Sequence, residues 1–403
     1  MRVPGFRFAG VTCGIKKSKK KDLALIFSER PATVAALFTT NRVKAAPVLV
    51  GMRRIRQGSA QAVVINSGNA NACTGVRGIR DAEAICRQVA IRLGIDPKLV
   101  IPSSTGIIGV PLPVKNVRDG IEKAVALLSP LSFSQAAEAI LTTDRFPKVS
   151  AVPCLLGGKK VVVAGMAKGA GMLAPRMTCP PSRSASRRAT MLAYILTDAA
   201  VEQSSLRDIL LRSADRTFHS ITVDGDTSTN DTILFLANGL AGNRPIVQGS
   251  REERTLEQGV SRITKELALK LVEDGEGATK VVEILVEGAR SVAEAKKVAF
   301  AVANSKLVKT AFFGEDPNLG RIMAAIGYAG VPVEPDRIGV SLDGVKVVRR
   351  GVVLNTRERE AALVLRRPSF RVGINLDQGK ESASVWTSDL SHDYIRINSA
   401  YRT

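Results

Sequence analysis

Apolar residues along the chain follow two alternating patterns, one with the period of a strand and one with the period of a helix. Short runs rich in valine and isoleucine predict strands over residues 62–65, 160–164, 281–286 and 370–375. Apolar residues at helical spacing predict helices over 81–93, with Asp81 as the N-cap, and over 206–214, 255–272 and 291–302. This alternation predicts a mixed α/β fold.

The length of the chain predicts more than one subdomain. A chain of 403 residues exceeds the size at which a single hydrophobic core keeps growing. Hydrophobic residues make up 45% of the chain and aromatic residues 4%, so valine, isoleucine, leucine and alanine must fill the cores. No apolar run reaches the roughly 18 residues that a membrane helix needs, and no signal-peptide pattern follows the N-terminal charges. We therefore expect a cytoplasmic protein.

Cysteines and glycine-rich segments give no indication of a metal or a cofactor. The five cysteines are odd in number and no two have C-x-x-C spacing, so we expect reduced thiols. Asp224, Asp226 and Asp231 lack the full ligand pattern of a calcium loop. No phosphate loop or dinucleotide-binding motif is present. We expect no metal and no cofactor.

The net charge of +21 is the unusual feature of the composition. Residues 1–60 hold thirteen lysines and arginines against two acidic residues, and the densest run is KKSKKK at 16–21. Such a patch could bind nucleic acid, but no aromatic residues are interleaved with it. We favour a solvated basic surface that also attracts anionic small molecules, with neither nucleic acid nor membrane as a partner.

The segment around Thr190 looks like a site where the chain could cut itself and make its own nucleophile. An Ala-Thr pair alone does not identify such a site, because a threonine in mid-chain is usually structural. The sequence ATMLAY at 189–194 follows KGAGM at 168–172. Cleavage between Ala189 and Thr190 would give Thr190 a free α-amine, whose ordinary pKa of about 7.7–8.0 leaves part of it neutral near pH 7. The amine could then take the proton of its own hydroxyl, so one residue would supply both nucleophile and base.

Eight further segments occur in a fixed order along nearly the whole chain. They are GFRFAGV at 5–11, VVINSGNANA at 63–72, SSTGIIG at 103–109, LTTD at 141–144, ITVDGDTSTND at 221–231, DGEGATK at 274–280, FGEDPN at 313–318 and RINSAYRT at 396–403. With these segments the chain resembles the ornithine acetyltransferase family. Eight ordered motifs are far more specific than any one of them.

The resemblance implies an enzyme of arginine biosynthesis that transfers acetyl from N-acetylornithine to glutamate, and in some members also from acetyl-CoA. It implies self-cleavage into chains 1–189 and 190–403, which assemble as a heterotetramer of two such pairs. It also implies a layered α/β/β/α core for the first two thirds. A smaller α/β domain would form mainly from residues 285–403.

The resemblance also assigns site residues. Thr105 and Gly106 match an oxyanion-hole pair, which an acyl transfer needs because its tetrahedral intermediate carries a negative oxygen. The positions that match substrate-binding residues are Thr142, Lys168, Thr190, Glu276, Asn398 and Thr403. An ammonium such as that of Lys168 suits a substrate carboxylate, and the carboxylate of Glu276 suits a substrate ammonium. Thr143 is a weaker candidate than Thr142.

The chain departs from the family just before the cleavage site. Residues 178–188 (TCPPSRSASRR) are an insert of eleven residues, Arg176 stands where the family usually has asparagine, and Leu319 stands where tryptophan is common. The insert is rich in proline, serine and arginine, so it predicts a flexible loop. Such a loop either relaxes the strained turn that self-cleavage needs or loops out while residues 188–190 keep their geometry.

Two other functions remain open from the sequence. The first is an N-terminal-threonine amidohydrolase or aminopeptidase of similar fold, in which water takes the acyl group. The second is an uncleaved, inactive relative whose basic surface binds nucleic acid or another partner.

Overall fold

The computed structural model describes residues 1–174, 177–179 and 191–400. Ala189, Thr190 and Thr403 lie outside these described residues, as do Arg176 and most of the insert. The chain divides into two compact units: unit 1 contains residues 1–219 and 226–271, and unit 2 contains residues 220–225 and 272–402.

Unit 1 is built on one hydrogen-bonded sheet. Its described strands are β1 (Phe6–Val11), β2 (Leu23–Thr39), β3 (Ser59–Asn69), β4 (Val100–Ile107), β5 (Lys148–Leu156), β6 (Lys159–Lys168), β7 (Met177–Thr178), β8 (Leu192–Thr197) and β10 (Thr232–Ala237). The strand order is β4-β3-β2-β10-β8-β6-β5, and β1 and β7 also pair with β2. The helices are α1 (Ala46–Arg54), α2 (Gly75–Leu93), α3 (Val114–Ala126), α4 (Phe133–Ala139), α5 (Gln203–Arg216) and α6 (Arg251–Glu273), whose last two residues fall in unit 2.

The long strand β2 makes this sheet into two layers. The first half of its 17 residues pairs with β1 and most of β3, and the second half pairs with β10, with a register shift against β3 between Phe27 and Ala32. Large side chains from both halves, such as Phe8, Ile26 and Tyr194, share one buried core. The two halves of the sheet therefore pack face to face, although β2 belongs to both.

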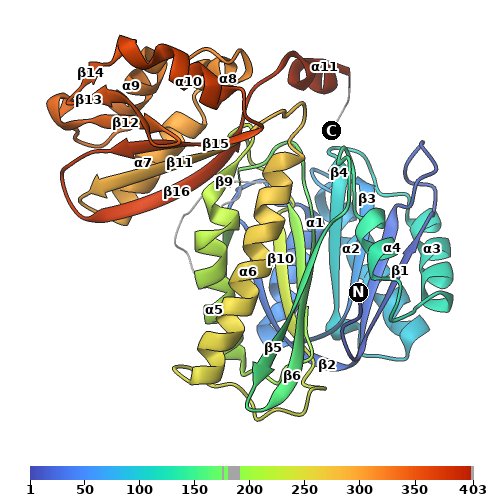
Figure 1. Cartoon of the computed structure of the whole chain (residues 1–403). Helices are drawn as coiled ribbons and strands as arrows, with labels where there is room; N and C mark the ends of the chain where they lie inside the picture. The colour runs from blue at the N-terminus through green and yellow to red at the C-terminus, as the bar shows by residue number, and fades with distance from the viewer. Residues whose placement is uncertain (175–176, 180–190, 401–403) are drawn as a thin grey trace. The chain divides into compact units, whose positions relative to one another are not determined.

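Helices cover the outer faces of these two layers (Figure 1). Side chains of α2 and α3 pack against β1–β4. Helix α5 contacts β2 and β10. Helix α6 lies against β6, where a Cβ at Gly165 would come within 2.9 Å of Leu267. The expected α/β/β/α layering is confirmed, with the difference that the described strands of both β layers form one sheet.

Unit 2 is a smaller α/β unit, as expected. Its described strands are β9 (Ile221–Thr222), β11 (Val281–Ala289), β12 (Gly339–Leu342), β13 (Val345–Arg349), β14 (Val352–Val353), β15 (Ser369–Asn375) and β16 (Glu381–Ser388), in the order β14-β13-β12-β15-β11-β16-β9. Its helices are α7 (Val292–Ala303), α8 (Lys306–Phe313), α9 (Leu319–Gly327), α10 (Glu358–Leu365) and α11 (His392–Ala400). The valine-rich faces of β11 and β15 and the apolar face of α7 form its core.

The predicted strands are confirmed within β3, β6, β11 and β15, and the predicted helices within α2, α5, α6 and α7. The prediction that Asp81 caps a helix is wrong. Helix α2 begins at Gly75 after Thr74, and Asp81 lies inside it, with Arg77 at 3.7 Å from its carboxylate. The first two turns of α2 contain two glycines and bury no large apolar side chain, so the buried apolar pattern begins later than the helix does.

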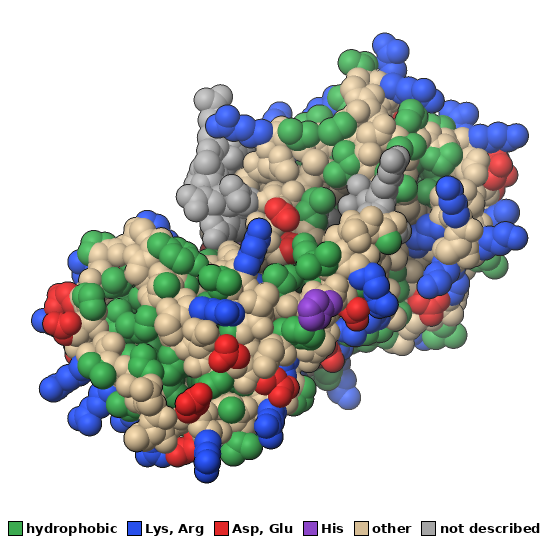
Figure 2. All heavy atoms as spheres, turned by 90° about the horizontal axis from the view of Figure 1, so that it is seen from above, with side chains coloured by type: hydrophobic (Ala, Val, Ile, Leu, Met, Phe, Trp, Pro, Cys, Tyr) green, Lys and Arg blue, Asp and Glu red, His purple; other side chains and the backbone are tan. Residues whose placement is uncertain are grey.

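Basic side chains are scattered over the face drawn in Figure 2. In the densest run, Lys17, Lys19 and Lys20 are exposed, as a solvated surface requires, but Lys16 and Lys21 are partly buried. None of the described helices is both long and apolar enough to cross a membrane.

A buried lysine in α8 forms hydrogen bonds to the end of β16 in unit 2. The ammonium of Lys309 donates hydrogen bonds to Thr387 Oγ1 at 3.0 Å and to the carbonyl and hydroxyl oxygens of Ser388. Burial lowers the pKa of Lys309 to about 7, although the carboxylates of Asp389 and Asp224 act in the opposite direction.

This lysine predicts that unit 2 becomes more stable as the pH rises above 7. Between pH 7 and the ordinary lysine pKa of about 10.4 the unfolded chain holds a proton that the folded chain lacks, so the free energy of unfolding increases with pH. We expect Lys309→Met to remove up to about 1.4 kcal/mol of this increase per pH unit. Urea unfolding at pH 7.5 and 9, followed by the single tryptophan, Trp386 in β16, measures it. The exposed Lys306→Met is the control and should keep the slope of the wild type.

Candidate active site

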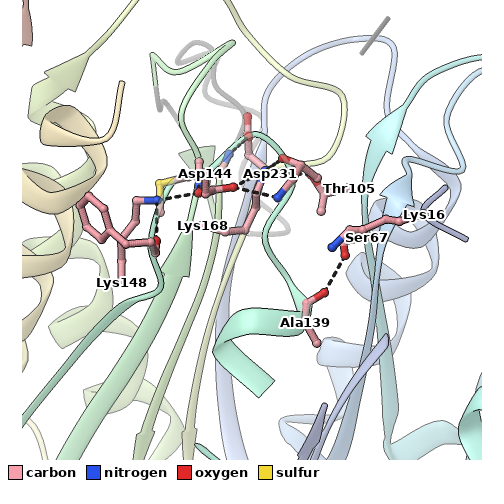
Figure 3. A network of polar contacts seen from close by, with 12 residues as sticks. Lys16, Ser67, Thr105, Ala139, Asp144, Lys148, Lys168 and Asp231 are labelled. Atoms are coloured by element: carbon pink, nitrogen blue, oxygen red, sulfur yellow. Dashed lines mark hydrogen bonds and ion pairs between the residues drawn. The ribbon is translucent and has the colours of Figure 1, made fainter. Parts of the chain in front are cut away.

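A buried carboxylate lies at the centre of the polar network in unit 1 (Figure 3). The side chains of Asp144 and Lys148 are fully buried, and Lys148 Nζ lies 2.6 Å from Asp144 Oδ1. The backbone N–H groups of Thr142 and Gly169 donate to the same carboxylate at 2.9 and 2.7 Å. Burial alone would raise the pKa of Asp144, but the ammonium groups of Lys168 and Lys148 and these hydrogen bonds hold it below its ordinary value.

Lys168 brings two of the expected site residues together. It is the last residue of β6 and is 3% exposed. Its ammonium lies 3.7 Å from Asp144 Oδ2, donates to Thr142 Oγ1 at 2.7 Å and reaches Thr105 Oγ1 at 3.3 Å. Because the Thr105 hydroxyl accepts from Lys168, its own hydrogen remains available to another acceptor.

Thr105 and Gly106 lie near the C-terminal end of β4, where it pairs closely with β3. The two strands run parallel, with Ser67 opposite Thr105 and Gly68 opposite Gly106. Gly106 has φ +130°, and a Cβ there would lie 2.4 Å from the carbonyl carbon of Gly68. Only glycine fits this position, so the motif at 103–109 needs Gly106 to bring the backbone this close.

Asn230 joins three sequence motifs next to these paired strand ends. Its side-chain amide donates to the carbonyl oxygens of Ala70 at 2.7 Å and Ser104 at 2.8 Å. The Ser104 hydroxyl donates to Asn66 Oδ1 at 2.6 Å. All of these side chains are buried. The motifs at 63–72, 103–109 and 221–231 are therefore held together by hydrogen bonds that leave Thr105 at the edge of the network.

The residue that follows Thr190 in the sequence is fixed beside the same network. Met191 is fully buried, its backbone N–H donates to Asp231 Oδ1 at 2.5 Å, and its carbonyl accepts from Thr232 N at 3.1 Å. Strand β8 then begins at Leu192, directly opposite Lys168 of β6. Ala189 and Thr190 themselves lie outside the described residues.

Two other expected site residues meet in unit 2. Asn398 of α11 donates from its side-chain amide to Glu276 Oε2 at 2.8 Å and to the carbonyl of Tyr394 at 3.0 Å. Glu276 is 7% exposed. The loop that carries it turns at Gly277, which has φ +69° and lies against the backbone of Tyr394. Thr403 lies outside the described residues.

The expected residues thus form two groups: Thr105, Thr142 and Lys168 in unit 1, and Glu276 with Asn398 in unit 2. Sequence reasoning did not assign roles to Asp144, Lys148, Asp231 or Lys16. Asp144 and Asp231 stood inside recognised motifs, and this was the available signal for them. Within the described ranges, no group of three or more His, Cys, Asp or Glu side chains is placed to hold a metal ion.

Residues 7–403 match the model of the ArgJ family. The chain is 50% identical to the arginine biosynthesis bifunctional protein ArgJ of Geobacter sulfurreducens, with 100% of both chains covered. It is 47% identical to the protein of the same name from Symbiobacterium thermophilum, with 99% of this chain and 97% of that one covered. It is also similar to the crystal structure of the arginine biosynthesis bifunctional protein of Bacillus halodurans. That likeness has 37% identity and a TM-score of 0.51, over 53% of this chain and 100% of the other.

Proposed function

The chain belongs to the ArgJ family, and from that membership we propose that this acetyltransferase moves acetyl from N-acetylornithine to glutamate in arginine biosynthesis. The observation that carries the proposal is the contact of Lys168 with both Thr105 and Thr142. It joins a hydroxyl able to stabilise an oxyanion to an ammonium able to bind a carboxylate. Both substrates carry a carboxylate, and both reaction steps pass through an oxyanion.

The first step acetylates the enzyme. The Thr190 hydroxyl attacks the acetyl carbonyl of N-acetylornithine, and its proton moves to the Thr190 α-amine. The Thr105 hydroxyl and the Gly106 N–H donate to the oxyanion that forms. The bond between the acetyl carbon and the ornithine nitrogen then breaks, the α-amine returns the proton to that nitrogen, and ornithine leaves behind an acetyl ester on Thr190.

The second step reverses the chemistry with a different amine. The amino group of glutamate attacks the ester carbonyl, the same two donors stabilise the oxyanion, and the proton passes through the Thr190 α-amine back to the threonine oxygen. Glu276 and Asn398 contribute to substrate binding, with Glu276 suited to an amino group. Thr403 joins them as a substrate-binding residue.

The threonine must first gain its free amine by cleavage between Ala189 and Thr190. Met191 is anchored to Asp231 and Thr232, which holds the chain on the C-terminal side of that bond. We propose that the two resulting chains stay together and assemble as two pairs.

Replacing Thr105 with valine tests its role in the oxyanion hole. Valine keeps the shape of threonine but cannot donate, so we expect kcat for acetyl transfer to fall by about 10²–10³. Thr105→Ser keeps the hydroxyl and should stay within about tenfold of the wild type. Steady-state transfer kinetics measure both variants. A Thr105→Val enzyme with unchanged kcat would place the oxyanion elsewhere.

The function is tested by the mass of the purified protein together with a transfer assay. We expect two chains, one of which begins Thr-Met-Leu-Ala-Tyr, and the appearance of acetylglutamate from N-acetylornithine and glutamate. Acetyl release to water instead of glutamate would identify an amidohydrolase. A single chain of 42.9 kDa without transfer would identify an uncleaved, inactive relative. The same assay with acetyl-CoA decides whether it is a second donor.

A further inference from the structure

The side chain of Lys16 lies against β3 at the residues that pair with Thr105 and Gly106 of β4. It lies between β1 and β2, in the densest basic run of the chain. Its Cγ would be 3.0 Å from a Cβ built on Gly68, and Gly68 is the register partner of Gly106. Figure 3 draws Lys16 beside Ser67, the register partner of Thr105. The side chain therefore belongs to the wall of the candidate site rather than to the open surface.

The position of this lysine is fixed by its own loop. The backbone N–H groups of Cys13, Ile15 and Lys16 all donate to the carboxylate of Asp22, at 2.6, 2.7 and 3.0 Å. Asp22 is fully buried. The loop is thus wrapped around a carboxylate that its backbone already binds, and this orients the Lys16 side chain.

The ammonium of Lys16 lacks an anionic partner among the described residues. It donates one hydrogen bond within its own loop, to the carbonyl oxygen of Lys21 at 2.7 Å. An ammonium has three donors, so two remain. Among the described residues no carboxylate forms an ion pair with it. The carboxylates of Asp22 and Asp144 act on it from beyond ion-pair distance, and the side chain is partly buried. A partly buried ammonium with unused donors can bind an anion.

A second ammonium lies close enough to Lys16 to act on it. Burial lowers the pKa of Lys16 to about 8, and the charges of Lys168 and Lys20 lower it as well, while the carboxylates of Asp22 and Asp144 oppose this shift. Two ammonium groups on one wall repel each other unless an anion binds near both. Lys168 already faces Thr105 and Thr142, so this wall would stabilise a negatively charged group.

We infer that Lys16 is a further substrate-binding residue, whose ammonium binds a carboxylate of the amino-acid substrate on the wall that it shares with Lys168. The inference deepens the proposed function and rests on it. Two carboxylates have the required chemistry: the α-carboxylate, which N-acetylornithine and glutamate share, and the side-chain carboxylate, which glutamate alone carries.

The test compares Lys16→Met with Lys17→Met in the full-length protein. Both variants lose one positive charge from the same loop, but Lys17 is exposed. For Lys16→Met we expect KM to rise about tenfold or more, the effect of losing a hydrogen bond to a charged group, with kcat changed less than threefold. Lys16→Arg should recover most of the loss, and Lys17→Met should match the wild type.

The pattern of KM values identifies the carboxylate. A rise for glutamate alone assigns Lys16 to the side-chain carboxylate, and a rise for both substrates assigns it to the α-carboxylate. Equal KM values in Lys16→Met and Lys17→Met would overturn the inference while leaving the acetyltransferase function intact. Calorimetric titration with glutamate separates the two failures. A wild type that transfers no acetyl but loses glutamate affinity through Lys16→Met would refute the function and keep the site.

Discussion

Thr190→Ala is expected to leave the protein as one chain of 42.9 kDa and to abolish acetyl transfer. In the proposed mechanism, the substitution removes the hydroxyl that attacks the preceding carbonyl during cleavage. It also removes the proposed nucleophile that carries the acetyl group afterwards. Loss of a covalent nucleophile lowers kcat by at least about 10³, because only binding and the oxyanion hole remain. Intact mass and a transfer assay measure the two effects on one sample.

Two control variants test whether the loss comes from the hydroxyl of Thr190 itself. Thr190→Ser keeps a hydroxyl beside the future α-amine, so it should still cleave and transfer, at reduced rates. Thr178→Ala removes a threonine from the segment upstream and should behave as the wild type. Acetyl transfer by an uncleaved Thr190→Ala protein at the wild-type rate would contradict the mechanism, since neither nucleophile nor amine would then be needed.

The proposed cleavage must also accommodate the insert at 178–188. The prediction of a flexible loop does not hold for its first residue. Thr178 lies in β7, paired with Phe38 of β2, so the insert begins within the sheet. Residues 180–188 lie outside the described residues, and for them the loop remains a prediction.

The apolar pattern predicted strands of two kinds. Residues 62–65 of β3 are all buried and form a continuous apolar run, whereas buried and less buried residues alternate along β11 and β15. Strands β8 and β10, which consist entirely of buried residues, were not predicted. Helix α2 shows the limit of this reasoning, since its first turns carry little apolar signal. The sequence also did not predict that one sheet folds into two layers through β2, because the apolar pattern does not reveal a register shift.

The site was predictable only where a motif carried it. The resemblance identified Thr105, Thr142 and Lys168, but the contacts among them depend on strand pairing far apart in the sequence. Lys148 had no motif, and its partner Asp144 was recognised without a role. Lys16 was interpreted as part of a solvated basic run. Composition does not distinguish a lysine that a buried carboxylate turns inward from its exposed neighbours.

Lys148→Met is expected to destabilise unit 1 by about 3–5 kcal/mol, the cost of removing one partner of a buried ion pair. The side chains of Lys148 and Asp144 are both fully buried and 2.6 Å apart, so water cannot replace the lost ammonium. Chemical unfolding at pH 7 measures the loss. The matched control is Lys21→Met, which breaks an ion pair of the same length with Glu138. The side chains of Lys21 and Glu138 are 35% and 47% exposed. That variant should lose less than about 1 kcal/mol.

The double variant Lys148→Met with Asp144→Asn decides what the loss represents. If the cost comes from an unpaired buried charge, removing that charge as well should restore part of the stability, because a neutral pair needs no counterion.

The pH dependence of the free energy of unfolding gives a second test of the same ion pair. The lowered pKa of Asp144 adds stability above the ordinary aspartate pKa of about 3.9, and this contribution is lost as the pH falls. Lys148→Met should reduce that acid-side loss, since the carboxylate is then held less strongly in its charged form. A loss below 1 kcal/mol in Lys148→Met would show that Lys168 and the backbone N–H groups are sufficient to hold Asp144.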